Sequence, residues 1–579
     1  GAHIDPEATI GKNVVIGRNV TVRAGARVGD FVVLGDNCVI GNNAVVSHSI
    51  IWGDTFIGKQ AQVNGALLCR RVDVRARAHV DPGAVIGDEV TIGQSAHIGA
   101  GVEIYPYKRV EPAALLNESL IWQSIGAKSL FGEHGISGLV GIDITPELGL
   151  RAAQAFGSLL PKGSHVIVSR DTSRASRMVK RAMVAGLNSA GCHVRDLRVA
   201  SSAINRFTTR DTRCMGGIHV AQSPSDPQVL DIQFYDKSGL DIAPWEEKKV
   251  ERLYFRGEFR RAFLDEVGDI IYPPRAIEYY SAGLQYAIEQ RGLSDKWLKV
   301  VADMSFGVTS IVVPQVVEKW HVDLVSLNPF SDAERTMVAL PGEHDSIEPL
   351  KRAIEMFQAD LGLRFDPGGE RVVLIAPSGR VLDGDTALHA FVDLWCRSYR
   401  GTLPIAVPLN ASEVVERIAG QFGREVLRPG RSRRSLASLA LQGLASFAGS
   451  TTGGYIFPDF LAASDAVMSM GMITRMLASD GRSLDEVVDS LPPFFKRTVG
   501  VFCPVDRKGA VMRVVTDSTV GRDTDLTEGV RIHLDNGWAL ILPHSSEPLV
   551  TIYVEGVDDA SADEIASEWQ QIVEGAIAG

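Results

Sequence analysis

Apolar residues recur every six positions along the first part of the chain. Isoleucine, valine or leucine stands at positions 4, 10, 16, 22, 28, 34, 40 and 46, a glycine commonly follows, and a small residue commonly stands four positions later. The period slips between Trp52 and Val72 and resumes from Val74 to Val110. A period of six matches neither an α-helix nor an ordinary strand. It predicts short strands joined by tight turns, with each apolar side chain pointing into a narrow prism.

This pattern resembles the hexapeptide repeat of left-handed parallel β-helices, which implies that fold for residues 1–125. One function of such helices is acyl transfer by a histidine in a groove between subunits. His48, His79 and His97 are the candidates for that role. Their interpretation as ordinary surface or turn residues is the favoured one, and the acyltransferase remains an alternative.

The other function of such helices is as a structural tail on sugar-nucleotide pyrophosphorylases. Residues 104–110 (IYPYKRV) and 117–122 (NESLIW) resemble the end of the tail in mannose-1-phosphate guanylyltransferases. The Gly-rich phosphate-binding motif of that family's catalytic domain does not occur in this sequence. The resemblance implies an upstream nucleotidyltransferase domain and a homo-oligomer formed through the β-helix.

From residue 126 onward, strand-like runs alternate with helical ones. Residues 166–169 and 299–303 are predicted as strands, and residues 175–190 as a helix that ends at Gly191. Such alternation is typical of α/β layers, in which ligands usually bind at the ends of the strands. A chain of 579 residues is long enough for several such domains.

Composition excludes some classes of protein. The net charge of −11 disfavours a nucleic-acid-binding protein, which usually presents a basic face. No apolar run is long enough to span a bilayer, so we expect no membrane partner. The six cysteines are widely spaced and show no metal-binding pattern, which is typical of reduced cysteines in a cytoplasmic protein.

Residues 128–579 resemble the phosphohexomutase family of phosphomannomutases and phosphoglucomutases. Residues 131–138 (FGEHGISG) are similar to the opening motif FGTDGIRG, and residues 169–176 (SRDTSRAS) to GRDTRxSS. The resemblance implies a multidomain body of three α/β domains and a C-terminal α+β domain. The expected limits are residues 126–275, 276–371, 372–490 and 491–579.

The family transfers phosphate through a phosphoserine in the loop TASHNP. The matching stretch here is AQSPSD, which places Ser223 at the phosphoserine position. Pro224 replaces the histidine and Asp226 replaces the proline, so the loop loses a backbone donor and gains a carboxylate that repels phosphate. An ordinary turn serine is the favoured interpretation, and a catalytic phosphate carrier is the alternative.

The family holds Mg²⁺ with three alternating aspartates in the loop DGDxDR. Here the loop is DPGGER, in which Asp366 and Arg371 survive, Gly368 replaces the middle aspartate and Glu370 replaces the last. A magnesium ion requires several oxygen ligands in near-octahedral array, so one missing ligand and one longer side chain should weaken binding. By resemblance, Asp366 and Glu370 are the candidate metal ligands.

The two remaining loops also depart from the family pattern. The sugar-binding loop GGExSGH becomes AGSTTGG, and the last phosphate loop RPSGTEP becomes LPHSSEP. The resemblance assigns sugar binding to Ser450, Thr451 and Thr452. It assigns phosphate binding to Arg371, His544, Ser545 and Ser546.

All four loops have thus lost polar or charged groups, although the residues around them are kept. We therefore expect a catalytically degenerate module that binds a sugar phosphate or a nucleotide sugar and has a regulatory or assembly role. An active mutase that uses Ser223 remains the alternative. A cluster of four arginines, which we interpret as a solvated loop, is a further candidate for phosphate binding: Arg428, Arg431, Arg433 and Arg434.

Overall fold

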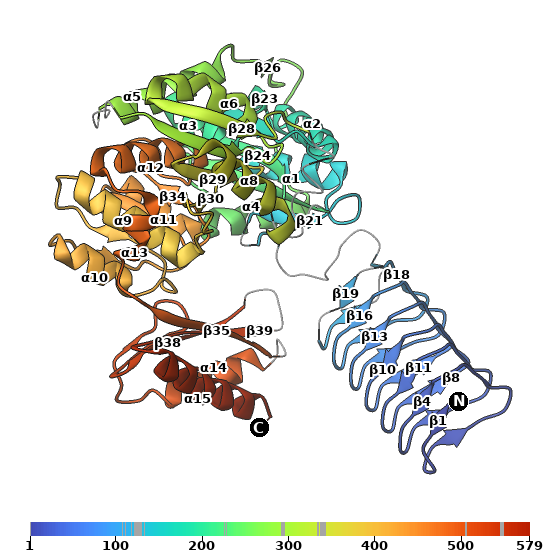
Figure 1. Ribbon diagram of the computed structural model, residues 1–579. Coiled ribbons are helices and arrows are strands. Elements are labelled where there is room, and N and C mark those ends of the chain that lie inside the picture. The colour runs from blue at the N-terminus through green and yellow to red at the C-terminus, as the bar shows by residue number, and fades with distance from the viewer. Residues whose placement is uncertain are drawn as a thin grey trace. The chain divides into compact units, whose positions relative to one another are not determined.

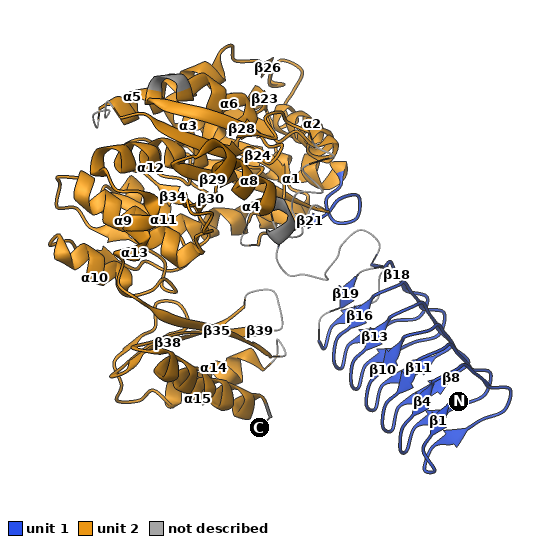
Figure 2. Cartoon of the chain, in the orientation of Figure 1, with its two compact units in different colours: residues 1–130, 138–145 blue, residues 131–137, 146–579 orange. Residues whose placement is uncertain are grey.

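A computed structural model of the chain divides into two compact units (Figure 2). Unit 1 comprises residues 1–130 and 138–145, and unit 2 comprises residues 131–137 and 146–579. The residues that the structure describes are 2–106, 108–110, 112–116, 119–120, 130–132, 134–224, 226, 228–290, 296–332, 335, 343–503, 507–544 and 549–578. Within these ranges, no helix combines the length and the hydropathy that crossing a membrane requires. The six cysteines are free thiols, in agreement with the prediction.

Unit 1 is a β-helix (Figure 1). Its described residues include twenty short strands, which form three parallel sheets. Each strand pairs with the third strand along the chain, so every coil contributes one strand to each sheet. The first sheet contains β1 (His3–Ile4), β4 (Thr21–Val22), β7 (Val39–Ile40), β10 (Phe56–Ile57), β13 (Asp73–Val74), β16 (Thr91–Ile92) and β19 (Arg109–Val110). The second contains β2 (Thr9–Ile10), β5 (Arg27–Val28), β8 (Val45–Ser47), β11 (Gln62–Asn64), β14 (His79–Val80), β17 (His97–Ile98) and β20 (Leu115–Leu116). The third contains β3 (Val15–Ile16), β6 (Val33–Leu34), β9 (Ile50–Ile51), β12 (Leu67–Leu68), β15 (Val85–Ile86) and β18 (Glu103–Ile104).

The inward residues of these strands form the core of the β-helix, as the six-residue period predicts. Val22, Leu34 and Ile40 are almost fully buried. The predicted slip between Trp52 and Val72 is only partly correct. The structure shows two steps shortened by one residue, from Val46 to Ile51 and from Val63 to Leu68, and the stack of coils continues through both.

The first sheet after the β-helix has six strands in the described part of the chain, five of them wholly within unit 2. Its strand order is β21 (Ile136–Leu139), β25 (Val229–Asp236), β24 (Gly216–Gln222), β22 (His165–Arg170), β23 (His193–Val199) and β26 (Ile270–Ile271). The helices along this stretch are α1 (Pro146–Leu159), α2 (Arg174–Ser189), α3 (Ser202–Asp211) and α4 (Pro244–Arg256).

Two four-stranded sheets follow. One has the order β28 (Val322–Leu327), β27 (Leu298–Asp303), β29 (Leu361–Phe365) and β30 (Val372–Ile375), with α5 (Ala276–Glu289), α6 (Thr309–Val316), the 3₁₀ turn η1 (Val317–Trp320) and α8 (Glu343–Phe357). The other has the order β32 (Val426–Leu427), β31 (Ile405–Ala406), β33 (Phe447–Gly449) and β34 (Tyr455–Ile456). Its helices are α9 (Gly384–Ser398), α10 (Val414–Gln421), α11 (Arg433–Leu441), α12 (Ala466–Asp480) and α13 (Leu484–Asp489).

The last sheet is antiparallel and has five strands. Its order is β35 (Phe495–Phe502), β39 (Leu549–Gly556), β38 (Gly537–Pro543), β37 (Val530–Leu534) and β36 (Thr524–Asp525), with α14 (Lys508–Asp517) and α15 (Asp559–Ala578). The predicted fold class, a left-handed β-helix followed by a multidomain α/β body, is therefore confirmed. The residue limits of the individual domains stay predictions.

The three α/β sheets repeat one arrangement. Each contains four consecutive strands, β22–β25, β27–β30 or β31–β34, of which the first lies between the second and the third. These three strands are parallel, and the fourth runs antiparallel beside the third. The antiparallel pairs are β24–β25, β29–β30 and β33–β34. Each pair is joined by a short connection, so three equivalent hairpin turns occur along unit 2.

Candidate functional site

The hairpin turns carry the candidate site residues. Ser223 follows β24, Asp366 and Glu370 lie between β29 and β30, and residues 450–452 lie between β33 and β34. His544 follows β38 in the last sheet. Motifs that are far apart in the sequence therefore occupy the same topological position in successive sheets.

Ser223 is held tightly at the end of β24. Its side chain is buried, its N–H donates to the carbonyl of Val229 at 2.9 Å, and its hydroxyl hydrogen-bonds to Asp231. The Asp231 carboxylate also accepts the Ser137 hydroxyl at 2.6 Å. Burial raises the pKa of Asp231, although these two hydroxyls oppose the shift. The predicted phosphoserine position is thus an internal hydrogen-bonding partner of a buried carboxylate.

A small cavity of about 40 Å³ adjoins Ser223. Four carboxylates line it, those of Asp171, Asp231, Asp366 and Glu370, and no lysine or arginine stands among the described residues that line it. A pocket for a drug-sized ligand usually has about 300–1,000 Å³, so the enclosed space of this cavity has room for only a few water molecules. The space beside Ser223 is therefore both small and acidic.

His219 adds no positive charge to the cavity. It is buried on β24, and its Nδ1 lies 2.8 Å from the Ser169 hydroxyl. Burial lowers the pKa of His219 to about 4, so the imidazole is neutral at physiological pH.

Asp366 and Glu370 come together as the sequence predicts, but both are already satisfied by protein donors. Asp366 Oδ1 accepts the backbone N–H groups of Glu370 and Arg371 at 2.8 and 2.6 Å. Glu370 accepts the Ser202 hydroxyl at 2.5 Å on Oε1 and forms an ion pair with Arg433 at 2.7 Å through Oε2.

The two carboxyl groups have opposite pKa shifts. Burial and the neighbouring charge of Glu370 raise the pKa of Asp366 to about 6. Burial alone would raise the pKa of Glu370 too, but Arg433 and Arg206 together lower it to about 2. Glu370 is therefore a firmly ionised carboxylate whose charge is balanced by guanidinium groups.

These carboxylates do not fit a divalent cation. The oxygens of Glu370 are both engaged, Oδ1 of Asp366 is aimed at backbone donors, and the Arg433 guanidinium lies where it would repel a metal. Throughout the described ranges, no group of three or more His, Cys, Asp or Glu side chains is arranged to hold a metal ion. The predicted ligands Asp366 and Glu370 are thus brought together as hydrogen-bond acceptors and not as an array around Mg²⁺.

The arginine cluster was interpreted from the sequence as a solvated loop, and that interpretation is wrong. Arg428 pairs with Glu416 at 2.7 Å, and Arg433 pairs with Glu370. Arg431 and Arg434 approach Glu528 and Asp236 at 3.6 and 3.9 Å. The cluster therefore connects several elements of unit 2. The RSRR sequence shows the positive charge of the cluster. It does not show the carboxylate partners, because most of them lie far away along the chain.

The candidate sugar-binding hydroxyls largely satisfy one another. Ser450 Oγ lies 2.8 Å from Thr452 Oγ1 and accepts the N–H groups of Thr452 and Gly454 at 3.3 Å. Thr452 is exposed, and Thr451 is half-buried. None of residues 450–452 lines the Ser223 cavity.

The candidate phosphate-binding residues are only partly described. His544 donates its N–H to Leu549 at 2.8 Å, and its carbonyl accepts the Lys508 ammonium group. Arg371 lies beside Asp366, on a different sheet from His544. Ser545 and Ser546 lie outside the described residues.

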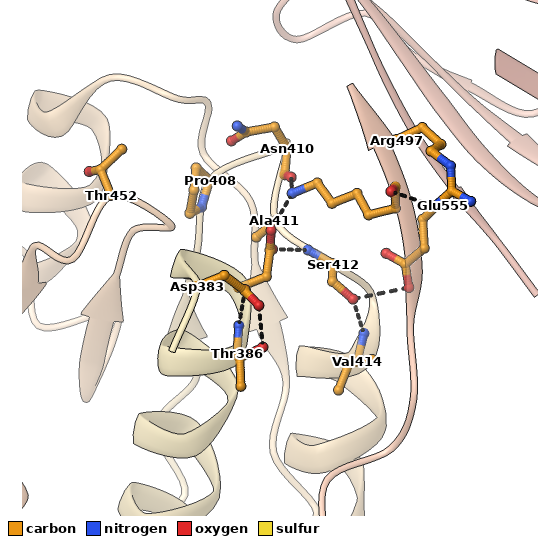
Figure 3. Close-up of polar contacts among 12 residues, drawn as sticks. Asp383, Thr386, Pro408, Asn410, Ala411, Ser412, Val414, Thr452, Arg497 and Glu555 are labelled. Atoms are coloured by element: carbon orange, nitrogen blue, oxygen red, sulfur yellow. Dashed lines mark hydrogen bonds and ion pairs between the residues drawn. The ribbon is translucent and has the colours of Figure 1, made fainter. Parts of the chain in front are cut away.

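Polar contacts anchor the last sheet to the sheet before it (Figure 3). Lys496 Nζ donates to Asp385 Oδ2 and to the Asn410 carbonyl, each at 2.7 Å. Glu555 accepts the Ser412 hydroxyl and the Glu413 N–H, each at 3.0 Å, as the close-up shows for Ser412. Burial raises the pKa of Glu555. The arrangement fixes β35 and β39 against the loop that follows β31.

The candidate acyltransfer histidines do not form one group. His79 and His97 are paired in register on adjacent coils with ring centroids 5.8 Å apart, and His97 Nε2 lies 2.8 Å from Asp81 Oδ2. His48 instead lies beside Phe31, with ring centroids 5.8 Å apart.

Comparisons with known proteins agree with this architecture. Residues 128–261 match the family described as phosphoglucomutase/phosphomannomutase, alpha/beta/alpha domain I, and residues 383–495 match domain III of the same family. Residues 1–98 match the EIF2B subunit epsilon LbH domain.

Similar proteins cover the body of the chain. A phosphoglucomutase/phosphomannomutase of Thermococcus kodakarensis is 27% identical over 455 residues, which are 78% of this chain and 99% of the relative. A "probable phosphoglucosamine mutase" of Methanopyrus kandleri is 29% identical over 448 residues, 76% of this chain and 97% of the relative.

Solved structures share the fold. A phosphoglucomutase/phosphomannomutase family protein from Burkholderia thailandensis has a TM-score of 0.67 at 18% identity and covers 78% of this chain and 98% of its own. Parafusin, a phosphoglucomutase from Paramecium, has a TM-score of 0.59 at 14% identity over 78% of this chain and 96% of its own. The chain therefore joins an N-terminal hexapeptide-repeat β-helix to a body in which two domains, residues 128–261 and 383–495, match the phosphoglucomutase/phosphomannomutase family.

Proposed function

We propose that this protein is a catalytically inactive phosphohexomutase-type module of a mannose-1-phosphate guanylyltransferase-like system. It binds a sugar phosphate or a nucleotide sugar without turnover and serves a regulatory or assembly role. An upstream nucleotidyltransferase domain, in the same chain or as a partner, belongs to this proposal. The observation that carries the loss of catalysis is the ion pair between Glu370 and Arg433 at 2.7 Å.

Electrostatics at Ser223 support the loss of turnover. A phosphorylated serine carries a charge of about −1.5 to −2 at neutral pH. Here that charge would stand among Asp171, Asp231 and Asp366, and the described residues form no metal site that would balance it. Two unit charges 4 Å apart interact by about 4 kcal/mol at the effective dielectric of a protein surface, so each carboxylate would oppose the phosphoenzyme substantially.

A coupled mutase assay tests the proposal. The substrates are glucose 1-phosphate, mannose 1-phosphate and, because several relatives are named as phosphoglucosamine mutases, glucosamine 1-phosphate. Mg²⁺ and a bisphosphohexose activator are added, and Ser223→Ala is the control. We expect no turnover above that of Ser223→Ala, with saturable binding of a sugar phosphate or GDP-mannose by calorimetry. Turnover that requires Ser223 would establish the alternative, an active mutase.

The assembly part of the proposal rests on the third sheet of the β-helix. Its outward residues on five successive coils are all aliphatic and paired in register: Val15, Val33, Ile50, Leu67 and Val85. With strands about 4.8 Å apart, they form an apolar stripe along most of the helix. The outward positions of the other two sheets include threonine, arginine, aspartate and histidine. Contiguous exposed apolar surface commonly marks an interaction site, so we propose that this face pairs with a second copy of the chain.

Sedimentation of the full chain tests this pairing. Ile50→Lys should shift the protein toward monomer, because it places a charge in the middle of the stripe. Gln62→Lys, at an outward position of the second sheet, is the matched control. An unchanged oligomer in Ile50→Lys, or a wild-type monomer, would remove the stripe as the interface. Acyl transfer with an acyl-CoA donor, measured before and after His97→Ala, tests the remaining alternative.

A further inference from the structure

A second cavity, of about 420 Å³, is lined by residues of β22, α2 and β23 together with Ile270 and Tyr272. It shares no lining residue with the Ser223 cavity. Its lining includes five basic side chains and a single carboxylate, that of Asp196; the basic residues are Arg170, Arg177, Lys180, Arg181 and Arg198. Although the chain has a net charge of −11, positive charge is therefore concentrated in this cavity.

The single carboxylate of the cavity, that of Asp196, already has hydrogen-bond donors within the protein. Both oxygens of Asp196 accept the Lys180 ammonium group, at 2.6 and 2.5 Å, and Oδ1 also accepts the Arg198 N–H at 2.7 Å. Among the described residues, no carboxylate lies within 4.0 Å of the Arg177, Arg181 or Arg198 guanidinium. Lys180 is thus neutralised, and the arginines keep their charge.

Arg170 is the buried member of this group. It is 9% exposed, and its guanidinium donates to the carbonyl of Asp171 at 2.5 Å and not to a carboxylate. Burial lowers the pKa of Arg170, and the nearby charge of Arg177 lowers it further. Burial also lowers the pKa of Lys180, with Arg170 and Arg181 adding to the shift. The cations are close enough to repel one another.

The arrangement works against the stability of α2. Arg177 and Arg181 are one turn apart on the same face of the helix, in its N-terminal half. A helix N-terminus favours negative charge, yet the first turn of α2 contains no acidic residue. Arg198 has a left-handed backbone with φ of 62°, and its guanidinium lies 4.9 Å from the centre of the Tyr272 ring. The end of β22, helix α2 and strand β23 therefore all bring cationic side chains to one cavity. A bound anion would reduce the repulsion between these side chains.

We infer that this cavity binds a small molecule that carries a diphosphate or a triphosphate. The cavity has four arginines that pair with no carboxylate of the described residues, and such a group carries three or four negative charges. A guanidinium group can also donate two parallel hydrogen bonds to phosphate oxygens. The volume lies within the usual range for small-molecule sites. The half-exposed ring of Tyr272 at the rim offers a flat surface for a nucleoside base. This site is independent of whether the Ser223 region binds a sugar phosphate.

Calorimetry on the full chain tests the inference with five probes: GDP, GDP-mannose, inorganic tripolyphosphate, pyrophosphate and GMP. We expect saturable binding of the first four, at least roughly tenfold weaker binding of GMP, and weakening of all by added salt. Tighter binding of GDP than of pyrophosphate would assign the site to a nucleotide, and equal binding would assign it to the phosphates alone.

Variants localise the site. Arg177→Gln with Arg181→Gln should weaken binding by roughly a hundredfold, because two charge-assisted contacts are lost. Arg252→Gln, an arginine on α4 that does not line the cavity, is the matched control and should change affinity less than about twofold. Arg198→Gln alone serves if the double variant fails to fold. Absence of binding by every polyphosphate at millimolar concentration, or binding that the arginine variants leave unchanged, would overturn the inference.

Discussion

Replacing Arg433 by glutamine should destabilise the hairpin between β29 and β30. The change leaves Glu370, whose side chain is 14% exposed, without its ion-pair partner at 2.7 Å. The pKa of Glu370 is about 2, against an ordinary value of 4.5. At 1.36 kcal/mol per pKa unit, this difference corresponds to about 3 kcal/mol of stability.

Arg433 shares this stabilisation with Arg206 and Ser202, which remain in the variant, so we expect a loss of about 2 kcal/mol. The sign of its pH dependence follows from the lowered pKa. The stabilisation is fully present above pH 4.5, the unfolded value, and disappears as the pH falls toward the folded value of about 2. The loss in Arg433→Gln should therefore be constant at neutral pH.

Hydrogen exchange of the peptide spanning β29 and β30 is the appropriate assay, because a chain with several sheets is not expected to unfold in one step. A double-mutant cycle with Glu370→Gln isolates the pair, and we expect a coupling energy of at least about 1 kcal/mol. Arg434→Gln is the matched control on the same helix, since its nearest carboxylate is 3.9 Å away. Losses that simply add in the double variant would refute the conclusion that the guanidinium neutralises this loop.

Three further results are expected. Asp366→Asn should stabilise the protein by about 1–3 kcal/mol above pH 6 and by nothing near pH 3.8. The raised pKa of Asp366 means that its ionisation destabilises the folded state, and this destabilisation grows as the pH rises from the unfolded pKa of 3.8 to the folded pKa of about 6. Urea titrations at several pH values measure this dependence. Mg²⁺ in the millimolar range should leave the melting temperature unchanged, because Asp366 and Glu370 already accept protein donors, and a rise of several degrees would show that the folded chain binds the ion. Lys496→Met should cost about 3 kcal/mol, since it leaves Asp385 without its ammonium partner, and should raise exchange in β35 and β39; unchanged exchange there would show that the contact does not anchor the last sheet.

The β-helix was predictable because its period is unlike that of any other structure. The two shortened coils were harder to locate, since Ile50–Ile51 and Leu67–Leu68 each present two adjacent apolar residues and the inward one cannot be chosen from the pattern. Geometry decides this choice, because only one residue of each pair faces the prism.

The body was predictable from the order of its motifs, and the chemistry of its site was not. The sequence placed Ser223, Asp366 and Glu370 in loops and showed which groups were missing. It did not show that Arg433, 63 residues after Glu370, supplies the counter-charge, because a run of arginines is by default assigned to solvent. The link between Ser223 and Asp231 was missed for a similar reason, since it joins two antiparallel strands whose register the sequence does not specify.

The shared position of the candidate loops has a consequence for how such a protein can change. Each of the three described loops turns the chain at the ends of two neighbouring strands, while the apolar core is formed by the strands and helices themselves. Substitutions in these turns therefore remove little buried apolar area, and the framework tolerates them. A lineage of this architecture can lose its chemistry one turn at a time and still fold. After such substitutions the sheets and helices still form a rigid scaffold. A few charged side chains on its surface are then enough to form a new binding site.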